Sequence, residues 1–175
     1  KPSLLTLNEV LTLFHEFGHG LHALLSDTKY KSQAGTNVKW DFVELPSQVM
    51  ENWALEKDVL DLFAKHYETG ELMPVELIEK MKAAKNFRSG SFFMRQVQFA
   101  ALDMAWHTQS ATDEVKDVEK FEYEICKDYY ILPPEGALNS PAFSHIFDGG
   151  YSAGYYSYKW AEILDADAFE AFKEN

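Results

Sequence analysis

The sequence predicts a mainly α fold with many helices and at most a short β element near residues 36–43. Three observations lead to this class. Apolar residues recur at helical spacing through most of the chain, proline and glycine cluster between those stretches, and no internal repeat or domain-splitting linker interrupts them. A length of 175 residues with 46% hydrophobic side chains is enough for one folded domain with its own core.

Six segments carry the helical pattern. They are residues 5–25, 47–65, 74–85, 92–107, 113–130 and 155–172. Asn8 is a suitable N-cap for the first segment, because Glu9 and Val10 follow it directly. Pro46 and Pro74 stand where the second and third segments begin, and proline is well tolerated in the first turn of a helix.

The second half of the chain alternates helical segments with breaks. Residues 92–107 are rich in apolar side chains and predict a buried helix. The acidic residues 113–130 carry apolar side chains at helical spacing and predict an amphipathic helix. Residues 131–141 contain three prolines and residues 148–154 contain three glycines, so both stretches predict loops.

Composition excludes several classes of partner and site. The formal net charge of −12 argues against nucleic acid and against anionic membranes, because both are bound through basic patches. The sequence has no apolar run long enough to span a membrane and no signal-peptide pattern at its start. Cys126 is the only cysteine, which excludes an internal disulfide and a cysteine-based zinc site. These features favour a cytoplasmic location, although periplasmic proteins can also lack disulfides.

The most informative segment lies in the first predicted helix and reads His15-Glu16-Phe17-Gly18-His19. Each residue of a helix advances about 100°, so side chains four positions apart project from one face. His15 and His19 can therefore hold one Zn²⁺ between them. Glu16 lies beside them and can take a proton from a metal-bound water, so the pattern is typical of a hydrolase.

Two histidines do not complete a catalytic zinc site, which usually has three protein ligands and one position open to water. The position six residues after His19 is Leu25, which excludes the metzincin pattern. His22 lies a further turn along the same helix, so a supporting or core role is favoured over ligation. The carboxylates that remain as candidates are Glu44, Glu51 and Glu56. Spacing alone does not choose among them.

Three blocks of the sequence resemble a known family. They are residues 15–22, 40–48 and 51–53, which read HEFGHGLH, WDFVELPSQ and ENW. Together they look like the thimet oligopeptidase family of zinc metallopeptidases (family M3), in particular its bacterial oligopeptidase A and dipeptidyl carboxypeptidase members. The resemblance implies a zincin-like catalytic domain with one Zn²⁺ per chain, held by His15, His19 and Glu44. It also implies that Glu16 is the general base and acid.

A further block, residues 145–158, reads HIFDGGYSAGYYSY. Taken alone, its tyrosines are best interpreted as an aromatic stripe on the last helix. The block is similar, however, to the family's glycine-rich loop that closes on peptide. This resemblance implies catalytic roles for His145, which contacts substrate, and for Tyr158, which donates to the oxyanion. The substrate-binding residues that it implies are Tyr151, Tyr155, Gly149 and Gly150.

The sequence thus predicts a zinc metallopeptidase that hydrolyses short peptides. Because the family's enzymes are several times longer, residues 1–175 are expected to be part of one catalytic domain, without its N-terminal helices and extreme C-terminus. The expected partners are short peptides and the absent remainder of the same polypeptide. Two alternatives stay open: a zinc-binding fragment without catalysis, and a helical interaction module with a chance motif. The sequence does not distinguish internal cleavage from release of C-terminal dipeptides.

Overall fold

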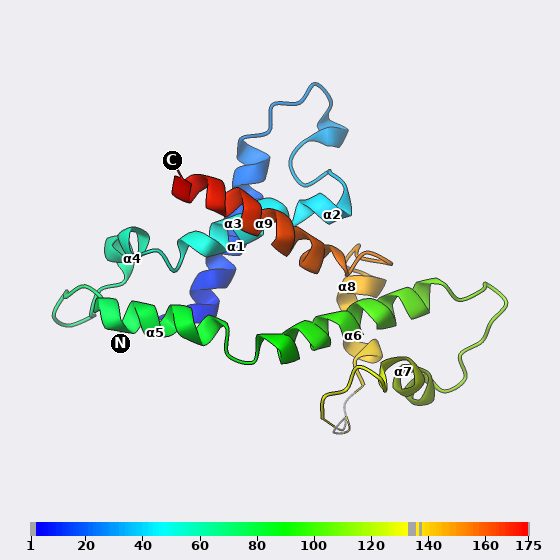
Figure 1. Cartoon of the computed structure of the whole chain (residues 1–175). Helices are drawn as coiled ribbons and strands as arrows, with labels where there is room; N and C mark the ends of the chain where they lie inside the picture. Colours follow the sequence, from blue (N-terminus) through cyan, green and yellow to red (C-terminus); the bar gives the residue numbers. More distant parts are fainter. Residues whose placement is uncertain (1–2, 133–135, 137, 175) are drawn as a thin grey trace. The chain divides into compact units, whose positions relative to one another are not determined.

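The computed structural model of this protein describes residues 3–132, 136 and 138–174. The chain is mainly helical, as predicted (Figure 1). The α-helices are α1 (Leu7–Leu24), α2 (Trp40–Val43), α3 (Leu45–Trp53), α4 (Lys57–Phe63), α5 (Val75–Lys85), α6 (Ser89–His107), α7 (Val118–Cys126), α8 (Ser144–Phe147) and α9 (Ser157–Glu174). Two 3₁₀ turns are η1 (Lys31–Gln33) and η2 (Ser140–Ala142). Within the described ranges, β structure is limited to one antiparallel bridge between Lys65 and Leu72.

The chain forms two compact units. The first comprises residues 1–87 and 160–175, with α1 to α5 and most of α9, and the second comprises residues 88–159, with α6 to α8. No helix of the described part has both the length and the apolar composition that crossing a bilayer requires.

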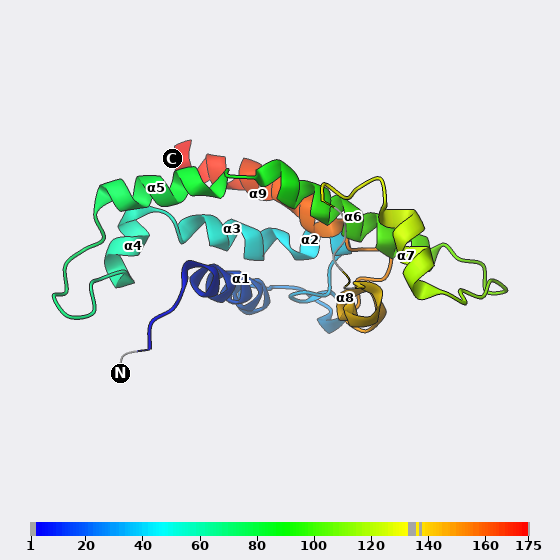
Figure 2. The ribbon, with the colours of Figure 1, turned by 90° about the horizontal axis from the view of Figure 1, so that it is seen from below.

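In the first unit, the most extensive helix contact joins α1 and α3, which lie side by side in Figure 2. Gly18 of α1 lies directly against the backbone of α3. A Cβ atom at this residue would lie 2.5 Å from Cα of Ser47 and 2.7 Å from the carbonyl oxygen of Pro46. Helix α1 can therefore reach the backbone of α3 only because residue 18 has no side chain.

Helix α9 packs against α3 in the same unit. The Trp53 ring lies 5.0 Å from that of Phe169 and 5.5 Å from that of Phe172, both in edge-on geometry. The Asn52 amide donates a hydrogen bond of 3.0 Å to Asp165. These contacts hold α9 against α3.

The second unit has its core where α6, α7 and α8 meet. Four buried residues form it: Leu102, Cys126, Phe143 and Ile146. The indole N–H of Trp106 donates to Oγ of Ser140 at 2.9 Å, so a polar contact also ties α6 to η2.

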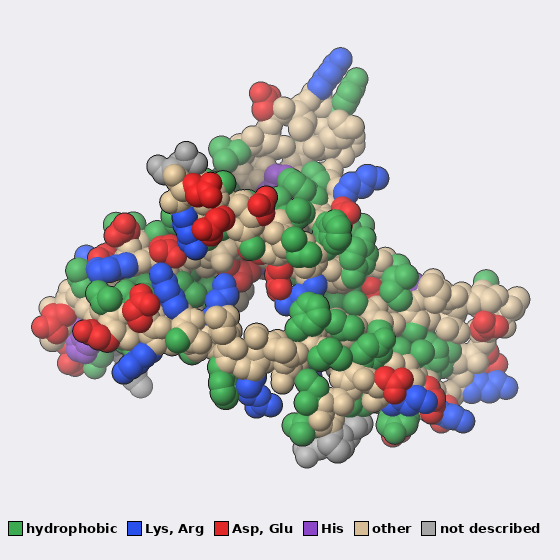
Figure 3. Space-filling model, viewed as in Figure 1, with side chains coloured by type: hydrophobic (Ala, Val, Ile, Leu, Met, Phe, Trp, Pro, Cys, Tyr) green, Lys and Arg blue, Asp and Glu red, His purple; other side chains and the backbone are tan. Residues whose placement is uncertain are grey.

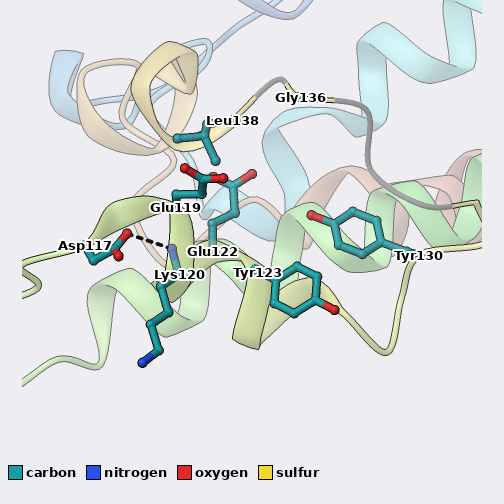
Figure 4. A pocket seen from close by; sticks show the side chains of 8 residues that line it. All are labelled: Asp117, Glu119, Lys120, Glu122, Tyr123, Tyr130, Gly136 and Leu138. Atoms are coloured by element: carbon teal, nitrogen blue, oxygen red, sulfur yellow. Dashed lines mark hydrogen bonds between the residues drawn. The ribbon is translucent and has the colours of Figure 1, made fainter.

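A pocket of about 330 Å³ lies beside α7 (Figure 4). Asp117 at its edge caps α7 by accepting a hydrogen bond from the Lys120 amide, drawn as the dashed line. Glu122 is buried and accepts hydrogen bonds of 2.8 Å from the amides of Asn139 and Ser140. Burial by itself would raise the pKa of Glu122. The hydrogen bond from the Ser140 hydroxyl, together with those from the two amides and the Asn139 side chain, outweighs burial and holds the pKa below its usual range. Asp117 and Glu122 of this pocket therefore have structural roles.

The start of α1 differs from the sequence prediction. The N-cap is Thr6, not Asn8. The Thr6 hydroxyl accepts a bond from the Glu9 amide, and the Glu9 carboxylate accepts one from the Thr6 amide at 2.6 Å. This reciprocal capping box satisfies two amides that a cap at Asn8 would leave without partners.

The sequence allowed at most a short β element near residues 36–43; none forms there, and α2 leads directly into α3. Two other expectations are corrected by the structure. The helix expected over residues 47–65 is broken between α3 and α4, where the backbone of Glu56 is extended and the side chains of Ala54 and Leu55 are buried. Helix α6 is only partly buried: Phe92 and Phe93 are 65% and 50% exposed, and hydrophobic side chains reach the surface of α6 in Figure 3. In the predicted loop over residues 131–141, positions 133–135 and 137 lie outside the described residues.

Candidate functional site

Helix α1 brings His15 and His19 together, as their four-residue spacing predicts. Their ring centroids are 4.9 Å apart and nearly perpendicular. Their Nε2 atoms lie 3.2 Å and 3.3 Å from the same atom, Oε2 of Glu44. Two imidazoles and one carboxylate oxygen therefore converge on one point.

Glu44 lies at the junction where α2 ends and α3 begins. Its side chain is 1% exposed, and the Ser47 hydroxyl donates to Oε2 at 3.1 Å. The close approach at Gly18 brings this junction up to α1. Of the three carboxylates that spacing left open, Glu44 is the one that meets both histidines, whereas Glu56 pairs with Lys82 at 3.4 Å.

The three side chains fit a zinc ion. Their ligand atoms all lie within 4.8 Å of one another. Two ligands that are each about 2.1 Å from a tetrahedral zinc are separated by about 3.4 Å, close to the distances between each imidazole and Glu44. A buried carboxylate also needs a nearby cation. In the described part of the chain, no other group of three His, Cys, Asp or Glu side chains converges in this way.

Glu51 has a role that sequence analysis did not identify. Its Oε1 lies 2.7 Å from Nδ1 of His15, so the Nδ1–H of His15 can donate to Glu51 while Nε2 faces Glu44. A carboxylate on the outer nitrogen fixes the orientation and tautomer of a metal-binding histidine. The signal present in the sequence is the seven-residue spacing from Glu44, which places both residues on roughly one face of a helix.

The two carboxylates also change the titration of His15. The pKa of His15 is raised to about 9, first by the hydrogen bond with Glu44 and then by the one with Glu51, while burial acts in the opposite direction. The metal-free protein therefore carries a proton on His15 at neutral pH. A metal ion that binds Nε2 of His15 must displace the proton from this nitrogen.

Glu16 and His22 lie on the same helix as the two converging histidines. The Glu16 carboxylate is exposed, and no side chain or amide of the described residues binds it. Such a carboxylate is available to accept a proton. His22 instead contacts the Phe42 ring, with centroids 6.2 Å apart, and does not join the cluster with Glu44.

In the second unit, residues 148–156 form the tyrosine loop between α8 and α9. The loop begins tightly: the Tyr151 amide donates to the carbonyl of His145 at 2.9 Å. Gly149 packs so closely that a Cβ atom there would lie 2.8 Å from Cα of His145. Gly150 has φ of +85°, which favours glycine. Both glycines of the predicted substrate loop are thus required by its backbone path.

The aromatic side chains around the tyrosine loop form one cluster. The His145 ring lies 6.1 to 6.4 Å from the rings of Tyr151, Tyr155 and Tyr158. Tyr151 stacks on Tyr158, with centroids 5.1 Å apart and an angle of 20°. Tyr155 packs inward against Phe143, and burial raises the pKa of Tyr155. The structure therefore brings the predicted residues of this block together, with Tyr155 on the core side.

Comparison with known proteins identifies the family. The model of Peptidase family M3 matches residues 1–175, the whole length of the chain.

The chain belongs to Peptidase family M3.

Several members of family M3 are similar to this chain over 99% of its length. Organellar oligopeptidase A, chloroplastic/mitochondrial, of Arabidopsis thaliana is 49% identical, and 22% of its own length is covered. Oligopeptidase A of Escherichia coli (strain K12) is 48% identical and dipeptidyl carboxypeptidase of the same organism is 42% identical, each with 26% of its length covered. The resemblance inferred from the motifs is confirmed. This M3 chain spans about a quarter of the length of these relatives.

Proposed function

We propose that this chain is the metal-binding catalytic part of a zinc peptidase that hydrolyses short peptides. The convergence of His15 and His19 on the buried Glu44 carboxylate carries this proposal. Membership in Peptidase family M3 supports peptide bonds as the substrate class. The names of the similar proteins, oligopeptidase A and dipeptidyl carboxypeptidase, point in the same direction.

The proposed mechanism assigns a task to each side chain around this convergence. Zinc held by His15, His19 and Glu44 would act as a Lewis acid and lower the pKa of water to about 7. Glu16 would accept the proton of the attacking water and return it to the leaving amine. Glu51 would keep the His15 ring oriented through Nδ1.

The cluster around the tyrosine loop is proposed to act on the substrate. Tyr158 would donate a hydrogen bond where negative charge develops on the carbonyl oxygen, and His145 would contact the peptide. Tyr151 would bind peptide, and its stacking on Tyr158 supports a fixed orientation of both rings. The backbone at Gly149 and Gly150 would approach the peptide closely. Tyr155 would help to position the peptide from the core side of the loop, where it packs against Phe143.

The wider context of the chain is proposed from the relatives. We infer that residues 1–175 belong to one catalytic domain, and that the remainder of the polypeptide is its partner, because the relatives are about four times longer. The cytoplasmic location stays a prediction, since one of the relatives is named as an organellar protein. Mass spectrometry of the products would distinguish internal cleavage from release of C-terminal dipeptides.

A second candidate function is zinc binding without catalysis. It is favoured by the quarter of the relatives' length that this chain covers. A helical interaction module with a chance motif does not fit a match of the whole chain to Peptidase family M3.

Two measurements test these functions. Elemental analysis of the purified chain is expected to find one zinc per chain. A short, internally quenched fluorogenic peptide is expected to be hydrolysed, and a chelator is expected to stop the reaction. Bound zinc without chelator-sensitive hydrolysis would support the second function. A chain that binds no zinc at the cluster would contradict both.

Replacing Glu51 by glutamine is expected to weaken zinc binding by about 10- to 100-fold, because His15 loses the carboxylate that orients it. The affinity is measured by competition with a chromogenic chelator. Glu56→Gln is the matched control, since Glu56 pairs with Lys82 away from the cluster. Equal zinc affinity in the two variants would contradict the role of Glu51.

The raised pKa of His15 predicts a pH dependence for the metal-free protein. Its folded pKa is about 9, above the ordinary value of 6.5, so the folded state holds a proton that the unfolded state has released. This contribution to stability is fully present below pH 6.5 and is lost as the pH rises through 9. The melting temperature with excess chelator is therefore expected to fall over this range. The fall should be smaller in Glu51→Gln, and an equal fall there would contradict this cause.

A further inference from the structure

Asp103 of α6 is a buried carboxylate that the proposed mechanism does not use. It is 1% exposed. Oδ1 accepts a hydrogen bond of 2.8 Å from the Ala153 amide, and Oδ2 accepts one of 2.9 Å from the Tyr155 amide. Both amides belong to the tyrosine loop. The two oxygens of the Asp103 carboxylate therefore bind two different backbone amides of this loop.

His107 completes this anchor from the next turn of α6. Its Nδ1 lies 2.8 Å from Oδ1 of Asp103 and 2.9 Å from the Asp103 carbonyl oxygen. A ring N–H at this position gives the buried carboxylate a further donor. His107, on the same helix, thus helps to orient the Asp103 carboxylate that binds the loop.

The backbone of the tyrosine loop requires such an anchor at Ala153. The φ angle of Ala153 is +53°, in the left-handed region that residues other than glycine rarely adopt. The bond from its amide to Asp103 holds it in this conformation. Ala153 and Tyr155 lie between Tyr151 and Tyr158 in the sequence, so the anchored stretch sets the path that joins the two stacked rings.

We propose that Asp103, supported by His107, is a positioning residue that fixes the backbone of the tyrosine loop and so orders the side chains that bind peptide. The link to peptide rests on the function proposed above. The anchoring of the loop does not rest on it, and the two parts have separate measurements.

The test uses the zinc-loaded chain and the variant Asp103→Asn. Asparagine has nearly the same shape but replaces one acceptor oxygen by an amino group, which cannot accept an amide hydrogen. Hydrogen–deuterium exchange followed by NMR is expected to be about tenfold faster or more at the Ala153 or Tyr155 amide. With a short quenched fluorogenic peptide, kcat/KM is expected to fall about tenfold or more, with a larger change in KM than in kcat.

Two further variants separate positioning from general stability. Asp117→Ala removes the N-cap of α7 in the same unit, and is expected to lower the melting temperature without changing exchange at these amides or kcat/KM. Ala153→Gly in the Asp103→Asn background is expected to recover part of kcat/KM, because glycine adopts a positive φ without steric cost. If Asp103→Asn does not fold, Asp103→Glu keeps the charge with a displaced carboxylate and is expected to give the same changes.

Each outcome bears on one part of the proposal. Unchanged exchange at both amides would overturn the anchoring. Faster exchange with unchanged kcat/KM would overturn the positioning role, and so would equal losses of kcat/KM in Asp103→Asn and Asp117→Ala. If the unsubstituted chain hydrolyses no peptide, the proposed function fails, while the exchange rates still decide whether Asp103 anchors the loop.

Discussion

Replacing Glu16 by glutamine is expected to remove most peptide hydrolysis while zinc remains bound. Glutamine keeps the size of the side chain but cannot accept the proton of the attacking water, so kcat should fall by about 10²- to 10⁴-fold. Zinc content should not change, because Glu16 is exposed and lies outside the cluster of His15, His19 and Glu44. The measurements are kcat with a fluorogenic peptide and elemental analysis of the same sample.

The matched control for this variant is Glu9→Gln, the same substitution on the same helix. Glu9 belongs to the capping box at Thr6, and glutamine can occupy that position of a capping box as well. Turnover and zinc content should both stay near those of the unsubstituted chain. Normal turnover in Glu16→Gln would disprove its role as the base, and loss of zinc from it would show that Glu16 holds the metal instead.

Replacing Gly18 by alanine is expected to have the largest effect on the fold of the metal centre. The added Cβ would lie within 3 Å of three backbone atoms of Pro46 and Ser47, none of which belongs to a flexible side chain. Overpacking of this kind typically costs about 1–3 kcal/mol, which urea unfolding would measure. Because α1 must move away from α3, His15 and His19 should separate from Glu44, and zinc affinity should fall in the same variant.

Gly20→Ala provides a close comparison for Gly18→Ala. Gly20 lies two residues further along α1, and no atom lies within 4 Å of the position its Cβ would occupy. Alanine at a helical position where its Cβ meets no other atom is expected to stabilise the helix by about 0.5–1 kcal/mol. Gly18→Ala should therefore lower the free energy of unfolding, whereas Gly20→Ala should raise it. Similar stability and similar zinc affinity would contradict the close contact between α1 and α3.

Local patterns were sufficient for the parts of the site that lie on one element. The spacing of His15 and His19 predicts that both project from one face, and the structure has them so. Glu44 could not be selected by spacing, because its meeting with the histidines depends on how closely two helices approach at Gly18. Glu51 was missed as a positioning residue for a related reason. The seven-residue spacing from Glu44 places Glu51 on the same side, but it does not by itself indicate binding to the outer nitrogen of a histidine.

The remaining differences between the predicted and the observed elements have separate origins. The helix expected across Ala54 and Leu55 is broken where these two side chains are buried, which periodicity alone does not indicate. Residues Trp40–Val43 have side chains common in strands, yet they form one helical turn ahead of Glu44. The cap at Thr6 was missed because Asn8 is an equally good capping residue by type. The capping-box pattern, Thr6 followed three residues later by Glu9, distinguishes the two.

The contact at Gly18 has a consequence for how distant relatives of this chain can be recognised. The five-residue zinc motif is usually written with two unrestricted positions between its histidines. In this fold those positions are not equivalent: Phe17 is 54% exposed and can vary, whereas residue 18 faces a backbone that leaves no room for any side chain. A search that demands glycine before the second histidine should therefore select chains in which a helix crosses at this distance, and reject unrelated zinc helices with the same histidines.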